Sequence, residues 1–72
     1  MTQKYWSSQL KADDDFDFPI KDVFYDGKTV FGPWAIMSQT SWNAYGVRKL
    51  GIGFGQKYQR QEDGRWLLVE GD

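Results

Sequence analysis

The sequence contains no cysteine and no histidine among its 72 residues. Disulfide bonds are therefore excluded, and so is a zinc site built from the usual Cys and His ligands. The commonest general base and the thiol nucleophile of enzymes are missing as well, which argues against most classes of catalyst. We predict no catalytic residue, no metal site and no cofactor, and we expect that the protein is not an enzyme.

Long apolar runs and a strong net charge are also missing. No stretch approaches the roughly 20 apolar residues of a membrane-spanning helix, so we expect a cytoplasmic protein without a membrane partner. The net charge of −1 gives no overall attraction to nucleic acid. The charges are nevertheless segregated, because residues 13–26 hold six Asp and one Lys, whereas residues 45–61 hold four cations and no acid.

Aromatic residues are abundant, with four Trp, four Tyr and five Phe. Each can bury about 150–250 Å², which suits a chain too short for a large aliphatic core. We expect Trp34, Trp42 and Trp66 in the core and Trp6 as the most exposed tryptophan. Tyr5 and Trp6 are candidate interface anchors that dock on the domain or on a partner.

An acidic cluster, Asp13 to Asp17, separates the first residues from the rest of the chain. Like charges at this density disfavour a helix or a central strand, so we predict a flexible acidic segment over residues 1–17 and a small α+β domain over residues 18–72. A calcium loop starting at Asp13 would need Gly and Glu at its sixth and twelfth positions. Those positions hold Phe18 and Phe24, which excludes that motif.

Two Asp-Gly pairs lie between β-rich runs, and such pairs favour tight hairpin turns. Asp26-Gly27 predicts a first hairpin in which Tyr25 pairs with Lys28. Asp63-Gly64 predicts a second hairpin in which Glu62 faces Arg65. The first hairpin carries apolar residues on both faces, so we expect both faces to be covered.

A short helix is predicted between the hairpins. The run from Ser38 to Ser41 offers N-cap oxygens, a helix of roughly Gln39 to Tyr45 can follow, and Gly46 can end it in the left-handed conformation. The predicted fold class is therefore α+β, with two antiparallel hairpins, one short helix between them and a single small domain.

The segment from Gly46 to Tyr58, GVRKLGIGFGQKY, admits two interpretations. It matches neither phosphate-binding glycine motif. Its glycines could supply positive φ angles or let the backbone pass close to a Trp, and its cations could simply pair with the acidic cluster. Alternatively, cations and aromatic rings on a loop suit single-stranded nucleic acid or an acidic protein patch. The candidate binding residues are Arg48, Lys49, Phe54, Lys57, Tyr58 and Arg60.

The blocks DGKTVFGPWAIM, YGV, GIGFGQKY and VEG, in this order, resemble a group of small, mostly uncharacterised bacterial and phage proteins. Relatives with cysteines look like zinc ribbons, with C-x-x-C pairs before the first hairpin and after the P-W-A-x-M block. Here, Asp13 and Phe16 stand at the first spacing, and Ser38 and Ser41 at the second. The resemblance implies a phage origin and a zinc-ribbon-like frame without metal, in which Phe16 or Trp42 fills the space of the metal.

Three functional hypotheses remain open. The first is a small non-enzymatic interaction protein, phage-encoded, that binds a host or viral protein in the host cytoplasm. The second is a nucleic-acid-binding module that uses the basic loop of residues 46–60. The third is a structural component of a virion or oligomer.

Overall fold

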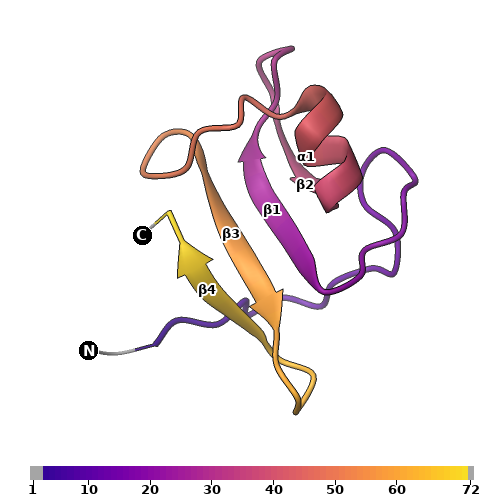
Figure 1. Ribbon diagram of the computed structural model, residues 1–72, viewed down its shortest axis with the longest axis vertical. Helices are drawn as coiled ribbons and strands as arrows, with labels where there is room; N and C mark the ends of the chain where they lie inside the picture. The colour runs from indigo at the N-terminus through magenta and orange to yellow at the C-terminus, as the bar shows by residue number, and fades with distance from the viewer. Residues whose placement is uncertain (1–2, 72) are drawn as a thin grey trace.

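The computed structural model describes residues 3–71. Its elements in chain order are strands β1 (Val23–Lys28) and β2 (Trp34–Met37), helix α1 (Gln39–Tyr45), and strands β3 (Gly55–Arg60) and β4 (Trp66–Glu70). These strands form one antiparallel sheet in the order β2-β1-β3-β4 (Figure 1). The predicted α+β class, with two antiparallel hairpins and one short helix, is confirmed.

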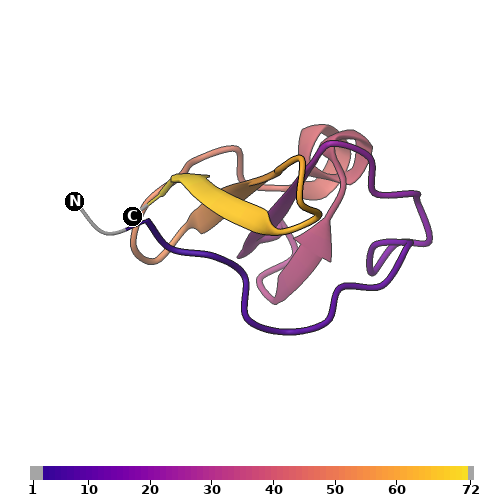
Figure 2. The ribbon, with the colours of Figure 1, turned by 90° about the horizontal axis from the view of Figure 1, so that it is seen from below.

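The two faces of the sheet are covered by different parts of the chain, as we expected. Helix α1 lies over one face, and the N-terminal segment crosses the other (Figure 2). Beneath α1, the ring of Tyr25 stacks on that of Trp42 with centroids 4.6 Å apart. On the opposite face, the fully buried Phe24 stacks on Tyr58 at 4.9 Å and meets Trp66 edge-on. The core is therefore mainly aromatic on both sides.

The first Asp-Gly pair does not form a turn, so the predicted pairing of Tyr25 with Lys28 is wrong. Strand β1 runs straight through Asp26 and Gly27, which pairs with Ala35 of β2 on one side and with Gly55 of β3 on the other. A side chain at Gly27 would come within 2.9 Å of the Trp42 ring. Glycine is needed here for close packing in the middle of the sheet, and the chain instead turns between Thr29 and Pro33.

Helix α1 has the predicted bounds, and its N-cap is Ser38, whose side chain accepts a hydrogen bond from the Ser41 backbone N–H. Gly46 is the C-cap, but its φ of −74° is not left-handed, so that part of the prediction is wrong. A Cβ at Gly46 would lie 2.2 Å from Cε3 of Trp42. Gly46 is thus required by the close approach of the indole ring, not by its own backbone conformation.

The second hairpin turns near Asp63-Gly64, with a longer loop than predicted. Gln61 N–H donates to the carbonyl of Arg65 at 2.7 Å, which leaves a three-residue loop in which Gly64 has a φ of +88°. Three-residue hairpin loops with a left-handed glycine are common. Because of this register, the expected pairing of Glu62 with Arg65 is wrong, and Arg65 forms an exposed ion pair with Asp63 at 2.8 Å.

Residues 4–16, here called the N-terminal strap, pack against both edges of the sheet. Trp6 N–H donates to the carbonyl of Trp66 at the outer edge of β4. At the outer edge of β2, Asp15 and Ile36 exchange hydrogen bonds of 3.0 and 2.8 Å. These contacts cross the boundary that we expected between residues 1–17 and 18–72. The outermost parts of those two ranges, residues 1, 2 and 72, lie outside the described residues.

Candidate interaction surfaces

Residues 47–54 form a loop before β3, here called the glycine loop, whose tip is closed by its own backbone. Gly51 N–H donates to the Gly55 carbonyl at 2.8 Å, and Phe54 N–H donates to the Gly51 carbonyl at 3.0 Å. Gly51 and Gly53 adopt φ angles of +130° and +87°, as the structural interpretation of these glycines predicts. This geometry holds Ile52 outward with 88% of its surface exposed.

The predicted binding residues are divided among different surfaces. Arg48 and Lys49 are exposed on the glycine loop, where the Lys49 ammonium lies 5.4 Å from the centre of the Phe54 ring. Two further cations, Lys57 and Arg60, project from opposite faces of β3, because side chains alternate along a strand. The last member, Tyr58, is half-buried in the aromatic core. Only Arg48, Lys49 and Phe54 therefore share one loop.

Lys57 and Arg60 each lie over an aromatic ring. The Lys57 ammonium is 5.8 Å from the ring centre of Tyr25, on the face covered by α1. The Arg60 guanidinium is 4.8 Å from the ring of Trp66, on the opposite face. Lys57 also stands opposite Glu70 in the β3–β4 register. Both cations thus have neighbours within the domain that account for their positions.

The acidic cluster does not neutralise the glycine loop. Within residues 3–71, no ion pair joins Arg48 or Lys49 to an Asp of residues 13–17. Figure 1 places the acidic stretch beside β2 and the glycine loop beyond the start of β3, on opposite sides of the sheet. Arg48 and Lys49 are therefore exposed on the loop without an ion pair to the acidic cluster in the described part of the chain.

Asp14 has a structural role inside the domain. Only 5% of its surface is exposed, and its Oδ1 accepts from Phe16 N–H and Phe18 N–H, each at 2.9 Å, while Oδ2 accepts from Ser38 N–H at 2.7 Å. Burial acts to raise the pKa of Asp14, but hydrogen bonds from Ser41, Ser38 and Phe18 outweigh it and hold the pKa below its usual value. This carboxylate joins the strap to the start of α1.

The hydrogen bonds of Asp14 also join residues 13–16 to residues 38–41, the two positions at which the resemblance described above would place C-x-x-C pairs. Residues 13–16 lie beside residues 38–41, and the Asp14 carboxylate bridges them through Ser38 and Ser41. A hydrogen-bonded carboxylate occupies this junction, and Phe16 packs against the core cluster that contains Trp42. Among residues 3–71, no three side chains of His, Cys, Asp or Glu gather closely enough to hold a metal ion.

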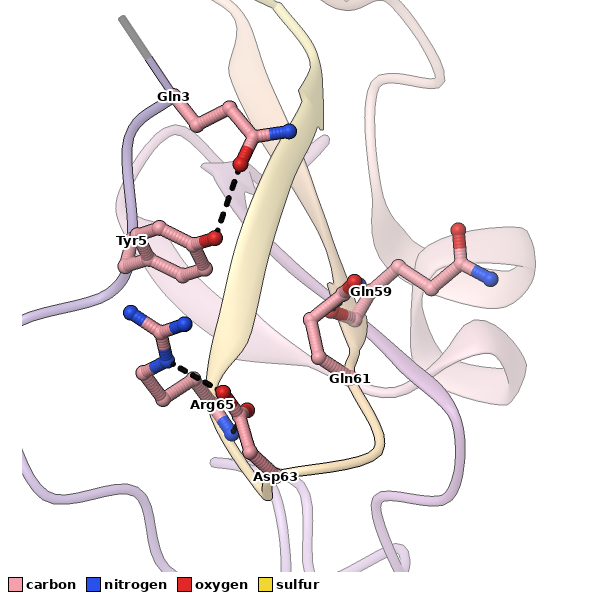
Figure 3. Close-up of polar contacts among 6 residues, drawn as sticks. All are labelled: Gln3, Tyr5, Gln59, Gln61, Asp63 and Arg65. Carbon is pink, nitrogen blue, oxygen red and sulfur yellow. Dashed lines mark hydrogen bonds and ion pairs between the residues drawn. The ribbon is translucent and has the colours of Figure 1, made fainter.

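The two candidate anchors, Tyr5 and Trp6, dock on the domain itself. The Tyr5 hydroxyl donates to Gln3 at 3.0 Å, and the Arg65 guanidinium lies 4.1 Å from the Tyr5 ring centre (Figure 3). The Trp6 ring meets Phe24 edge-on at 5.3 Å, and its Nε1 is buried without a hydrogen-bond partner. Trp6 is therefore partly buried, and the expectation that it is the most exposed tryptophan is wrong.

The hairpin joining β1 to β2 carries exposed apolar residues that we did not predict as a surface. Val30 and Phe31 are 62% and 69% exposed, and Trp34, which we expected in the core, is 45% exposed. The signal in the sequence is a run from Thr29 to Met37 that contains no charged residue and is broken by Gly-Pro. The displaced turn explains the error, because it carries Val30 and Phe31 beyond the covered part of the sheet.

A groove lies at the other end of β1, between the chain leading into β1 and the start of α1. Its apolar wall consists of Phe18, Pro19 and Val23, and its volume is about 480 Å³. Lys21 and Asp22 also line it. We call it the Phe18 groove. In the described part of the chain, the single helix α1 is too short to cross a membrane.

Comparison with known proteins found no match: no family model, no curated protein and no solved structure matches the chain. The likeness to small bacterial and phage proteins therefore stays a resemblance in a few short sequence blocks. Functional inference rests on the surfaces described above.

Proposed function

We propose that this chain is a small non-enzymatic interaction protein that binds another protein through the tip of the β1–β2 hairpin. The observation that carries the proposal is the exposure of Val30, Phe31 and Trp34 on the segment from Thr29 to Met37, which contains no charged residue. Large apolar side chains in a group on a soluble domain are typical of protein contacts, and aromatic residues often dominate binding energy. The partner would offer an apolar cleft.

The uncharged segment from Thr29 to Met37 favours a protein over nucleic acid as the partner, and the one cation on the β1–β2 hairpin is Lys28, opposite Trp34. Nucleic-acid affinity depends on cations that neutralise phosphates, and the run from Thr29 to Met37 has none. The cations that we considered for nucleic acid are divided between the glycine loop and the two faces of β3. The phage origin, the host or viral partner and the cytoplasmic location belong to the same proposal and rest on the resemblance in sequence blocks.

The proposal is tested with a photo-cross-linking residue placed at Phe31 and, as the control, at Val69, an exposed apolar residue on β4. We expect Phe31 to cross-link a defined protein in cells that express the chain. Substitution Trp34→Ser should abolish that product. Equal cross-linking from Phe31 and Val69 would contradict the proposal.

The salt dependence of binding distinguishes the alternative function, nucleic-acid binding, from the protein binding proposed above. If the chain instead retains single-stranded DNA or RNA, and this retention falls steeply between about 50 and 200 mM salt, the nucleic-acid hypothesis replaces ours. The variant Lys49→Ala should then weaken retention, whereas Trp34→Ser should leave it unchanged.

A further inference from the structure

We infer that the cleft of the protein partner has an acidic rim, and that the glycine loop binds this rim. The apolar part of the cleft meets the hairpin tip at Val30 and Phe31. The carboxylates of the rim meet the exposed cations Arg48 and Lys49. The inference rests on the proposed function, because it extends the same contact site to the loop beside the hairpin and names the chemistry of the partner.

The hairpin tip and the glycine loop are joined through the backbone at the end of β1 (Figure 1). Lys28 N–H donates to the Phe54 carbonyl at 2.9 Å, and the Lys28 carbonyl accepts from Val47 N–H at 3.0 Å. Both ends of the glycine loop are therefore held by Lys28. Beyond it, Val30 N–H donates to the Tyr45 carbonyl at 2.8 Å. The two surfaces thus form one fixed unit that a single partner can contact.

The distance between the apolar and the basic parts follows from this pairing. Thr29 and Gly46 form an isolated antiparallel bridge. Because the two backbones run in opposite directions, Val30 lies one residue to one side of the bridge and Arg48 lies two residues to the other side. At about 3.3 Å per residue, Val30 and Arg48 are roughly 10 Å apart along the strands. The acidic rim is therefore expected at this distance from the apolar part of the cleft.

The charge of this part of the chain is positive. No Asp or Glu occurs from Gly27 to Gln61, a range that holds the hairpin tip and the whole glycine loop. Lys28 has the half-buried Asp26 two residues before it on the same face of β1, so these two charges offset each other. Arg48 and Lys49 form no ion pair within the described residues and carry the surplus charge. Opposite charges across an interface orient the partner and exclude others.

Arg48 also has a backbone conformation that favours glycine. Its φ of +60° is left-handed, and a residue with a Cβ is less stable there than glycine. The other positive φ angles of the glycine loop belong to Gly51 and Gly53. The chain thus places a cation where its backbone favours glycine, and residues in such strained conformations cluster at contact sites.

Val30 and Ile52 favour an acidic protein surface over nucleic acid as the partner of this site. Their aliphatic side chains are 62% and 88% exposed and offer no ring on which a base could stack. The affinity for nucleic acid depends on the number of phosphates that are neutralised, whereas one or two carboxylates match Arg48 and Lys49. An apolar cleft with an acidic rim therefore suits both kinds of side chain.

The charge of the rim is tested on the product that the photo-cross-linking residue at Phe31 forms. In lysate of the cells that express the chain, the double variant Arg48→Glu, Lys49→Glu should lower the yield of this product about 10-fold. The control is Lys11→Glu, Lys21→Glu, which changes the net charge equally at exposed positions outside the site. The control should leave the yield unchanged within about twofold.

The position of the rim is tested with a second cross-linking residue at Phe54, whose ring lies 5.4 Å from the Lys49 ammonium. It should capture the same protein as Phe31, and mass spectrometry should place the captured residue beside Asp or Glu. Replacing those acidic residues of the partner by Lys should restore the product that the double variant Arg48→Glu, Lys49→Glu loses.

The outcomes separate this inference from the proposed function. If Phe31 captures no defined protein, both fail. If Phe31 captures a protein but reversing Arg48 and Lys49 lowers the yield no more than the control does, the hairpin binds a protein and the acidic rim alone is refuted. If the reversal lowers retention of single-stranded DNA or RNA and leaves the protein product unchanged, these cations bind nucleic acid and the inference is overturned.

Discussion

Replacing Asp14 by Asn tests whether a buried carboxylate holds the N-terminal strap to α1. The amide has nearly the same shape, and its oxygen can keep the bonds from Phe16 N–H and Phe18 N–H. Its NH₂ group must then face the Ser38 N–H, which now donates at 2.7 Å to a carboxylate oxygen. Two donors facing each other cannot form a bond, so a buried N–H loses its acceptor.

The cost can be worked out from this geometry. A hydrogen bond to a charged group contributes about 1.5–3 kcal/mol, and an unsatisfied buried donor costs about 1–3 kcal/mol. We therefore expect Asp14→Asn to lower the free energy of unfolding by about 2–3 kcal/mol. The melting temperature should fall by about 10 °C or more. Asp14→Ala removes every acceptor and should cost at least about 4 kcal/mol, which approaches the whole stability of a small domain.

The assay is thermal and urea unfolding followed by tryptophan fluorescence. The matched control is Asp17→Asn, which removes the same charge from the same segment at an exposed position. Asp17 has a φ of +66°, a conformation that Asn also tolerates, so this variant should change stability by less than about 0.5 kcal/mol. An Asp14→Asn variant as stable as the wild type at pH 7 would refute the reasoning.

The pH dependence gives an independent check. Because the folded pKa of Asp14 lies below its usual value, ionisation of this carboxyl stabilises the folded state. That stabilisation is complete above the unfolded pKa near 3.9 and is lost as the pH falls through the lower folded value. The stability difference between the wild type and Asp14→Asn should therefore be constant near neutral pH and shrink in strong acid. A difference that does not depend on pH would show that the charge is not involved.

Further predictions concern packing and one other carboxylate. Gly46→Ala should destabilise the domain by about 3 kcal/mol, because its methyl group overlaps the Trp42 ring; a double-mutant cycle with Trp42→Phe should recover part of this loss in urea unfolding. Trp6→Ala should cost about 2–3 kcal/mol and Trp34→Ala less than about 0.5 kcal/mol, and equal values would contradict the assignment of core and surface. Burial and the charge of Asp15 raise the pKa of Asp26, so ionisation of Asp26 destabilises the fold. Asp26→Asn should therefore increase the free energy of unfolding at pH 7 by up to about 1 kcal/mol, measured by urea unfolding. This gain should disappear below about pH 4, where the carboxyl is protonated in both states.

The parts of the fold that depend on neighbouring residues could be predicted from the sequence. Helix α1 has the expected bounds because its cap, Ser38, lies beside it in the chain. The second hairpin turns where Asp63-Gly64 indicates, with a one-residue difference in pairing. The two Asp-Gly pairs look alike in sequence, yet the first lies inside β1, because Gly27 packs under Trp42 and opposite Gly55. Such contacts between distant residues leave no local signal.

The candidate surfaces, like the fold, could be predicted only where residues adjacent in the sequence reveal them. The glycine loop stood out by composition, and its exposed cations Arg48 and Lys49 could be proposed directly. Side chains alternate along a strand, so Lys57 and Arg60, three residues apart in the predicted second hairpin, could have been separated from the sequence. The exposed hairpin tip was missed because its apolar residues resemble core residues until the position of the turn is known.

The strap has a consequence for the order in which the protein can be completed. During synthesis Trp6 leaves the ribosome early, whereas its hydrogen-bond acceptor, Trp66, belongs to the last strand. The rings of Phe24 and the strap must therefore wait without their β4 neighbours until Trp66 has been made. Closing so long a loop slows folding, and a nascent chain truncated before β4 should need a chaperone to remain in solution. The contact that joins Trp6 to β4 is thus also one that the order of synthesis delays.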